Sequence, residues 1–378
     1  MAITLTNVQI VTEDETLRGT LIYGAGGVVE VQPGNSAAPG AEDCEGDFIA
    51  PGLIECHTDN IERHFAPRPG VVWPNPLASA LAHDAQIVGA GITTVYNAVC
   101  VGGYDDGKDF RTKIMTSMIE AIDDARRKSL LRADHRLHLR CETTDPKMMG
   151  YLTQSGTADA VKLASLMDHT PGQRQWRDLD NYRKFIKGEG RTEDEIEEII
   201  KAEIDRASQP VHENFQKAVA FFKQRDIPMA SHDDTTVEHV ADAHAAGCMI
   251  AEFPTTVEAA QAAREKGMKI VAGAPNVVRG GSHSGGVAVT ELAKWKLVDV
   301  LSSDYVPASL LQAVHALSKS TMTLHEAAGL ATWRAADMLG LADRGRLTPG
   351  QRADFVRFRV IDGTPIVRAV TVGGQRVF

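Results

Sequence analysis

The middle of the chain repeats one pattern, in which short apolar runs alternate with stretches of helical periodicity. Apolar runs without a polar face are typical of strands buried on both sides, and strands that alternate with helices form parallel sheets. Eight such strands predict an α/β fold, a closed (β/α)8 TIM barrel whose active site lies at the carboxyl ends of the strands. The expected strands are Leu53–Thr58, Thr93–Ala98, Arg136–Glu142, Val161–Asp168, Ile227–Asp233, Met249–Phe253, Lys269–Ala274 and Val298–Asp304.

Both ends of the chain show a different residue pattern. Short runs of alternating or apolar residues are separated there by glycine, proline, asparagine and aspartate. This pattern is typical of antiparallel strands joined by turns. We therefore predict a small β-sandwich domain made from both termini, residues 1–50 and 343–378, and place the barrel in residues 51–342.

Residues 173–223 interrupt the barrel pattern with dense charge and then a helical period. Thr192 and Glu195 have the spacing of a capping box that opens a helix. We predict an exposed helical excursion between the fourth and fifth strands, and a lid or partner-binding role for it stays open.

Composition excludes several functional classes. The formal net charge of −10 argues against nucleic-acid binding, which needs clustered lysine and arginine. The first residues lack a cationic region followed by a long apolar run, and no apolar stretch is long enough to cross a bilayer. The 5 cysteines are widely spaced and form neither a disulfide framework nor a paired zinc motif. We expect a cytoplasmic protein that contacts neither nucleic acid nor membrane, and we allow for a homo-oligomer.

The predicted strand ends carry nearly every residue type that binds metal ions. Residues two apart in a strand project on the same side, so His57 and Asp59 can grip one ion. A single strand-end aspartate usually caps the next helix, and a single buried histidine usually has hydrogen-bond partners. Helix capping and hydrogen bonding do not readily explain all the acids and histidines at the strand ends together, because burying many acids without a cation is costly.

These residues predict a site for two divalent metal ions, Zn, Mn or Fe. We expect His57 and Asp59 to hold one ion, His232 and Glu252 to hold the other, and Glu142 to bridge them. Paired metals activate water and stabilise the attacking and leaving oxygens, so the expected chemistry is hydrolysis, with Asp304 accepting the proton. The expected metal ligands are His57, Asp59, Glu142, His232, Glu252 and Asp304, and the expected catalytic residues are Asp304, Glu142 and His232.

Several motifs carry a family resemblance. The runs Pro51–Asp59 and Gly91–Val95, followed by His232 and Asp304, resemble in this order the motifs of the amidohydrolase superfamily. The closing run Gly345–Val356 is similar to that superfamily's return into its small β domain. The resemblance covers almost the whole chain and implies a metal-dependent hydrolase.

Three longer runs narrow the resemblance. His57–His64, Asp168–Gln175 and Ala251–Thr256 resemble those of a diphosphatase family in the carbon–phosphorus lyase pathway of phosphonate metabolism. This implies hydrolysis of alpha-D-ribose 1-methylphosphonate 5-triphosphate to the 5-phosphate and pyrophosphate. Most members of the superfamily have histidine where this chain has Asp59 and Glu252. An oxygen-richer ligand set suits Mn as well as Zn, so the identity of the metal stays open.

A phosphorylated ribose phosphonate, the implied small-molecule partner, needs positive charge and hydrogen-bond donors. Basic residues follow the first and fourth strands, and a glycine-rich run follows the seventh, where backbone N–H groups can approach phosphate oxygens. Glycine-rich runs are also common flexible turns, and arginines are often simply solvated. The expected substrate-binding residues are Asn60, Glu62, Arg63, His64, Arg68, Asp168, His169, Arg174, Arg279 and His283.

Two alternatives stay open. A deaminase or cyclic amidase acting on a C–N bond would share the barrel and the metals, and would differ in the basic residues that bind phosphate. A non-catalytic barrel scaffold would be expected to have lost its metal ligands, whereas this sequence carries a full set.

Overall fold

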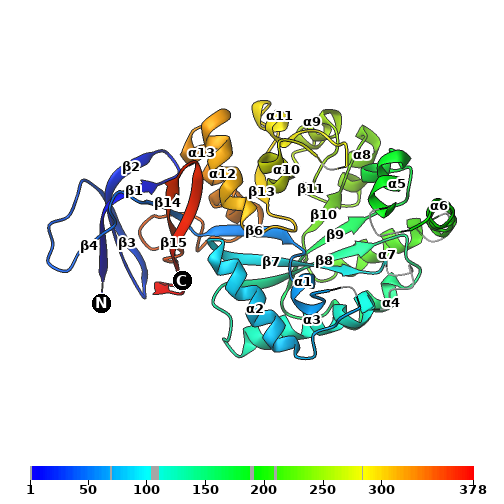
Figure 1. The fold of residues 1–378 in the computed structure, drawn as a ribbon, viewed down its shortest axis with the longest axis horizontal. Coiled ribbons are helices and arrows are strands. Elements are labelled where there is room, and N and C mark those ends of the chain that lie inside the picture. Colours follow the sequence, from blue (N-terminus) through cyan, green and yellow to red (C-terminus); the bar gives the residue numbers. More distant parts are fainter. Residues whose placement is uncertain (1, 69, 104–109, 188–190, 208–210, 283) are drawn as a thin grey trace.

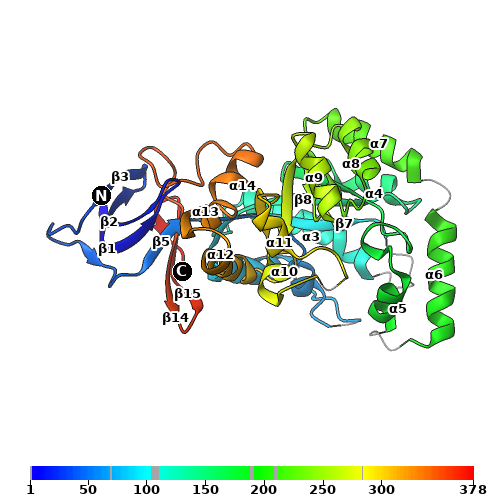
Figure 2. The same cartoon turned by 90° about the horizontal axis from the view of Figure 1, so that it is seen from above.

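The computed structural model describes residues 2–68, 70–103, 110–187, 191–207, 211–282 and 284–378, without the side chains of residues 110–113. Figure 1 shows an elongated molecule with a small β domain at one end, a barrel in the middle and a helical excursion at the other end. Figure 2, the view from above, shows the same three parts in a row.

The barrel is built from eight parallel strands whose spatial order follows their order in the chain. Each of the eight expected strands overlaps one of them, which confirms the predicted barrel. The strands are β6 (Leu53–Thr58), β7 (Ile92–Val101), β8 (Asp134–Glu142), β9 (Val161–Met167), β10 (Met229–His232), β11 (Ile250–Glu252), β12 (Lys269–Gly273) and β13 (Val300–Ser302).

The first and last strands meet at a seam. Paired backbone ladders join the neighbouring barrel strands from β6 round to β13, whereas polar side chains close the seam within the described residues. The buried Glu55 carboxylate accepts hydrogen bonds from the amides of His57 (2.7 Å) and Ser303 (2.6 Å) and from the Ser302 hydroxyl (2.8 Å). Thr58 Oγ1 also donates to the carbonyl of Asp304 at 2.5 Å. A buried acid therefore ties the two strands together.

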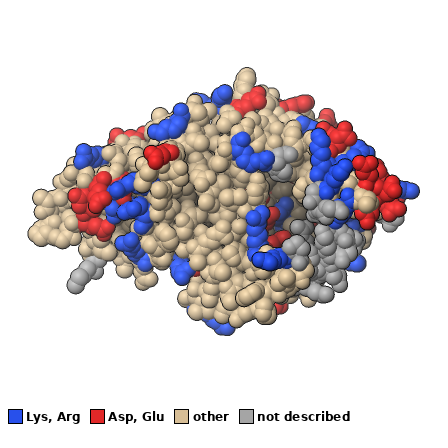
Figure 3. All heavy atoms as spheres, viewed as in Figure 1, with Lys and Arg blue, Asp and Glu red and all other residues tan. Residues whose placement is uncertain are grey.

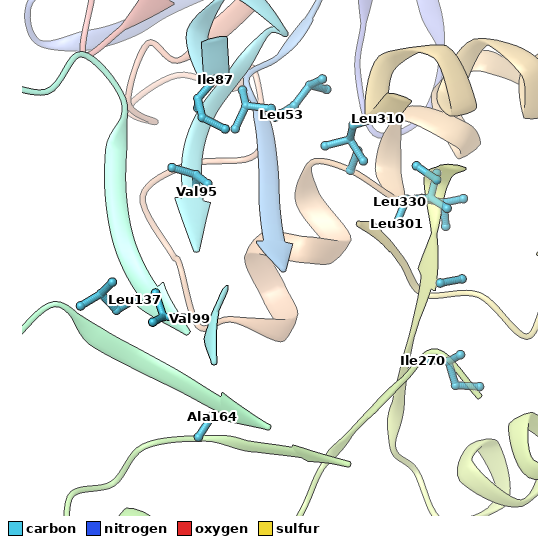
Figure 4. Packing of buried hydrophobic residues seen from close by; sticks show 14 of the residues in the cluster. Leu53, Ile87, Val95, Val99, Leu137, Ala164, Ile270, Leu301, Leu310 and Leu330 are labelled. Atoms are coloured by element: carbon cyan, nitrogen blue, oxygen red, sulfur yellow. The ribbon is translucent and has the colours of Figure 1, made fainter. Parts of the chain in front are cut away.

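Helices cover the outside of the barrel and bury one large apolar core between themselves and the strands. Figure 4 shows part of this core, in which Leu53 and Ile87, Val99 and Leu137, and Leu301 and Leu330 gather from strands and surrounding segments. Burial of apolar surface of this kind contributes about 25 cal/mol per Å² and holds the strand ends in place. The helices are α1 (Glu62–Phe65), α2 (Pro76–Gly89), α3 (Phe110–Arg127), α4 (Met148–Ser155), α7 (Val211–Lys223), α8 (Val237–Ala245), α9 (Val257–Glu265), α10 (Ala274–Arg279), α11 (Val289–Lys294), α12 (Ser309–Ser320), α13 (Leu324–Gly329) and α14 (Trp333–Met338).

A separate eight-stranded mixed sheet combines both ends of the chain, as predicted. The N-terminal and C-terminal parts meet where the fifth strand pairs with the fourteenth, in antiparallel register from Phe48 to Pro51. The boundaries at residues 50 and 343 stay a prediction. The strands are β1 (Ile3–Val11), β2 (Thr16–Gly24), β3 (Gly27–Pro33), β4 (Glu42–Asp43), β5 (Phe48–Pro51), β14 (Phe355–Ile361), β15 (Thr364–Val372) and β16 (Gln375–Arg376).

The excursion contains the short helix η1 (Arg174–Trp176) and the helices α5 (Leu179–Lys187) and α6 (Glu193–Ala207). The predicted capping box is present, because the Thr192 amide donates to Glu195 Oε2 at 2.8 Å and the Glu195 amide donates to Thr192 Oγ1 at 3.4 Å. An apolar cluster of its own, which includes Trp176 and Tyr182, holds the excursion together apart from the main core.

None of the helices in the described ranges combines the length and the apolar character needed to span a membrane.

Candidate active site

One strand, β8, sends a row of polar side chains into the barrel. Its intervening residues Leu137, Leu139 and Cys141 belong to the outer apolar core. Because successive side chains of a strand point to opposite faces, every second residue faces the lumen. The residues on the lumen face are Arg136, His138, Arg140 and Glu142.

His57, His138 and Glu252 form the first potential metal-binding group. All three are buried, and one ligand atom from each lies within 4.8 Å of the others. His57 Nδ1 lies 3.2 Å from Glu252 Oε1, and the other carboxylate oxygen accepts a hydrogen bond from the Ser165 hydroxyl at 2.6 Å. The strands β6, β8, β9 and β11 thus converge on one carboxylate.

His169, His232 and Asp233 form the second group, again with one ligand atom each within 4.8 Å. His232 also lies beside the first group, because its Nδ1 is 3.2 Å from Glu252 Oε2. The two groups are therefore neighbours that share the Glu252 carboxylate as a common contact.

Burial sets the protonation of the imidazoles. It lowers the pKa of His138 to about 4 and that of His232 well below its ordinary value, so both rings are neutral near pH 7. Burial opposes ionisation of Glu252, yet the neighbouring rings of His57 and His138 outweigh it and hold the pKa of this carboxyl well below its usual range. Neutral imidazoles beside an ionised carboxylate are the protonation states that metal ions require.

The second group fits a cation for an additional reason. Asp233 Oδ2 is buried and has no hydrogen-bond partner among the described residues. It lies 3.5 Å from His232 Nε2 and 3.8 Å from His169 Nε2. Leaving a buried carboxylate oxygen unsatisfied is costly, and a divalent ion would satisfy it together with both imidazoles. The donor set matches Zn, Mn or Fe.

Glu142 lies beside the second group. Its Oε2 is 2.6 Å from His169 Nδ1, and its Oε1 accepts a hydrogen bond from Thr144 Oγ1 at 2.8 Å. Burial opposes ionisation of this carboxyl, but the charge of His169 lowers its pKa. The carboxylate is therefore ionised and aligned with a ring that faces Asp233.

Asp304 follows β13, beyond the seam. Burial and then the charge of Asp59 raise the pKa of its carboxyl to about 7. Asp304 has a φ angle of 52°, and Asp233 has a φ angle of 54°, so both strand-end aspartates adopt the left-handed conformation. Such a backbone is uncommon for residues other than glycine and re-aims the side chain after the strand.

Two cavities open above the strand ends. The first, of about 270 Å³, is lined by residues that include His57, His232, Asp304 and the glycine-rich loop after β12. The second, of about 300 Å³, is lined by Glu62, Glu142 and Arg206 among others. Figure 3 shows acidic and basic atoms together inside a recess on this face. The residues shared by both cavities are Asp59, Arg140, His169, Gln175, Trp176 and Phe185.

The structure brings most of the predicted metal ligands together. Glu252 and the predicted substrate residue Asn60 are buried behind the cavities, and the Asn60 amide donates to the carbonyl of Tyr305 at 3.4 Å. The predicted residues that line a cavity are His57, Asp59, Glu62, Glu142, His169, His232, Arg279 and Asp304.

Six predicted substrate-binding residues, Asn60 among them, lie outside both cavities. Arg63 and Arg68 are exposed. The ring of His64 lies 2.8 Å from Gln86, Asp168 accepts a hydrogen bond from the Thr170 amide, and Arg174 donates to Asp234 at 2.6 Å. A position shortly after a strand does not fix the direction of a side chain, because the direction also depends on local structure, such as the helix α1 that contains Arg63 and His64. His283, also predicted, lies outside the described residues.

The site residues expected from the sequence did not include His138, Arg140 and Asp233, although Asp233 stands among the metal-capable residues at the end of the fifth strand. The first two alternate with Glu142 on one strand, so strict period-two spacing from a predicted ligand could have found them. Asp233 directly follows the predicted ligand His232, and adjacent residues of a regular strand face opposite sides. Its left-handed backbone removes that restriction.

No family model matches the chain. The protein alpha-D-ribose 1-methylphosphonate 5-triphosphate diphosphatase of Escherichia coli (strain K12) is 42% identical over 378 residues, which cover 99% of this chain and 100% of that protein. The chain belongs to this diphosphatase family. The match extends over both the terminal β domain and the barrel, and it confirms the narrower of the two resemblances seen in the sequence.

Solved structures of other enzymes resemble this chain in fold. The N-acetyl-D-glucosamine-6-phosphate deacetylase of Mycobacterium smegmatis has a TM-score of 0.64 at 17% identity, and the alignment covers 100% of both chains. The 5-methylcytosine deaminase of Klebsiella pneumoniae has a TM-score of 0.65 at 13% identity, with 100% of this chain and 98% of that one covered. At these identities the likeness shows the amidohydrolase fold alone.

Proposed function

We propose that this protein hydrolyses a phosphoanhydride bond of alpha-D-ribose 1-methylphosphonate 5-triphosphate and releases the 5-phosphate and pyrophosphate, as a step of phosphonate catabolism. The observation that carries the proposal is the 42% identity to the Escherichia coli diphosphatase along the whole chain. The polar cavities at the strand ends support it.

We further propose that the site holds divalent metal ions, two of them, with Zn, Mn and Fe as candidates. His57, His138 and Glu252 would contribute to one, and His169, His232 and Asp233 to the other. Asp59, Glu142 and Asp304 would complete the ligand sets, and each lines a cavity that a member of these groups also lines. Such ions, when bound, activate water and neutralise charge that develops on phosphate oxygens.

The chain's own residues would bind and orient the substrate. The first cavity offers Arg279 and the backbone of the glycine-rich loop to phosphate oxygens. Trp176 and Phe185, whose ring centroids lie 4.8 Å apart, form an apolar wall on the excursion side. This wall would exclude water beside the phosphate chain and give the excursion a substrate-binding role.

Asp304 would take the proton from the water that attacks phosphorus. It lies in the first cavity, where a carboxylate oxygen can face that water. The proton would then leave to solvent through the cavity, while pyrophosphate leaves as an anion. Replacing Asp59, which lines both cavities, with alanine should abolish activity and lower metal content.

The proposal is tested by incubating the metal-loaded protein with the triphosphate and measuring the products. We expect equal amounts of pyrophosphate and 5-phosphate. Release of inorganic phosphate instead would place the cleavage at the terminal anhydride. A protein that releases no phosphate species, but produces ammonia from nucleobases, would be a C–N hydrolase and would refute the proposal.

We also propose the type of partner, the cellular location and the oligomeric state. The substrate is a small molecule, and contact with nucleic acid or a membrane is not needed for the reaction. A cytoplasmic location and a homo-oligomeric state are open to test by fractionation and by light scattering.

A further inference from the structure

Arg140 occupies an unusual place in the barrel. It lies on the lumen face of β8, two residues before Glu142, and its side chain is 14% exposed. Among the described arginines it is the one that lines both cavities, since Arg279 lines the first and Arg206 the second. The guanidinium therefore stands where the two cavities meet.

The Arg140 guanidinium makes few hydrogen bonds to the described part of the protein. Its Nη1 donates to Asp59 Oδ2 at 3.3 Å, which is longer than the 2.7–2.9 Å that is typical of a hydrogen bond between charged groups. Its Nε is buried and has no partner in the described part of the chain. A guanidinium carries five N–H donors in a planar fork, and the contact with Asp59 uses one of them, so most have no partner among the described residues.

A neighbouring arginine shows the contrast. Arg174 donates through Nη1 to Asp234 at 2.6 Å and to the carbonyl of His232 at 3.0 Å, and it lines neither cavity. Its contacts are those of an arginine that fixes local structure. Among the described residues Arg140 makes no comparable pair of short contacts, although its side chain is slightly less exposed, at 14% against 18% for Arg174.

The ligand chemistry follows from the geometry of the fork. A buried cation that offers parallel N–H groups to a cavity matches the paired oxygens of a phosphate group. A chain of phosphates that passes from one cavity to the other would bring such oxygens to the junction. The competing explanation is that Arg140 only neutralises Asp59, Asp304 and Glu62, whose charges surround it.

We infer that Arg140 is a substrate-binding residue that holds the phosphate chain at the junction of the two cavities. The inference rests on the proposed function. It adds Arg140 as a residue that binds the substrate, and it specifies how the substrate is oriented. The two ends of the substrate lie in different cavities, and Arg140 binds the segment between them.

The test measures binding of inorganic pyrophosphate to the metal-loaded full chain by titration calorimetry, with metal content and thermal stability recorded for each protein. The variants are Arg140→Ala, Arg140→Lys and the control Arg127→Gln, a 66% exposed arginine on α3. We expect Arg140→Ala to weaken pyrophosphate binding about 10- to 100-fold, as for loss of a hydrogen bond between charged groups. Arg140→Lys should be intermediate, and the control should match the wild type.

Chemical rescue separates binding from structure. Guanidinium at millimolar concentration should partly restore pyrophosphate binding to Arg140→Ala and leave the wild type unchanged, because it fills the space of the missing fork. If Arg140→Ala does not fold, weakened binding by Arg140→Lys at full metal content carries the same conclusion.

Three results would overturn the inference. Unchanged pyrophosphate affinity in both Arg140 variants would show that the phosphate chain does not touch this residue. Loss of metal in both variants, with normal affinity per metal-loaded molecule, would assign Arg140 to charge neutralisation alone. A wild-type protein that neither binds nor releases pyrophosphate would refute the proposed function itself, and the assignment of Arg140 with it.

Discussion

Glu55 provides a sharp test of how the barrel is closed. Its carboxylate is buried and accepts two hydrogen bonds across the seam between β6 and β13, from Ser302 (2.8 Å) and Ser303 (2.6 Å). It accepts a third within β6, from the amide of His57 at 2.7 Å. Replacing Glu55 with glutamine keeps the shape of the side chain and exchanges one acceptor oxygen for an N–H₂ donor. At least one buried backbone N–H then faces a donor.

The cost can be worked out from these contacts. Loss of one hydrogen bond to a charged acceptor costs about 1.5–3 kcal/mol, and the donor left unsatisfied brings the total to about 2–4 kcal/mol. Burial raises the pKa of Glu55, so the neutral amide recovers part of this cost by avoiding the burial of a charge. We expect Glu55→Gln to lower the free energy of unfolding by about 2 kcal/mol.

Urea unfolding followed by circular dichroism measures this change, with Glu265→Gln as the matched control. Glu265 is the exposed last residue of α9, where the same substitution should change stability by less than about 0.5 kcal/mol. Metal content should be measured as well, because Glu55 holds the amide of His57. Equal stability of Glu55→Gln and the control would refute the view that this carboxylate closes the barrel.

Three further predictions follow from the site and its supports. His138→Gln should weaken metal binding by on the order of 10- to 100-fold, measured by competition with a chelator, and unchanged affinity would remove His138 from the ligand set. Phe185→Ala should raise KM by about 2- to 10-fold at constant metal content, because the ring forms part of the cavity wall; an unchanged KM would mean that the substrate does not reach it. Burial opposes ionisation of Asp134, but Arg136 and Arg344 outweigh it and lower its pKa below the ordinary 3.8. A depressed pKa stabilises the folded state above pH 3.8, and this contribution is lost as pH falls through the folded-state pKa. The Asp134→Asn variant should therefore be less stable than the wild type at pH 7 and should lose less stability as the pH falls. Urea unfolding at several pH values would measure both effects. An equal loss in the free energy of unfolding at every pH would contradict a depressed pKa of Asp134.

The barrel and the terminal β domain could be predicted because periodicity records which faces are buried. The run Leu53–Thr58 matches its strand at both ends, and the other seven apolar runs overlap theirs. The predicted ligands His57, His232 and Glu252 converge because parallel strands deliver their carboxyl ends to one side.

The sequence could not show the pairing of these ligands. Glu252 contacts both His57 and His232, and this depends on the curvature of the closed barrel. Arg63 and Arg68 were expected to bind the substrate, yet both are exposed and line neither cavity. The direction of such side chains depends on tertiary contacts that no local sequence pattern encodes. Arg140 was missed for the opposite reason, since it lies within a strand whose last residue alone was considered.

The pairing of β5 with β14 has a consequence for how the protein is made. β5 leaves the ribosome early, while its partner emerges only after the whole barrel has been synthesised. Throughout that interval one edge of the N-terminal strands has no native neighbour, and open edges invite pairing with other chains. That edge stays open to non-native pairing until the last strands of the same chain cover it.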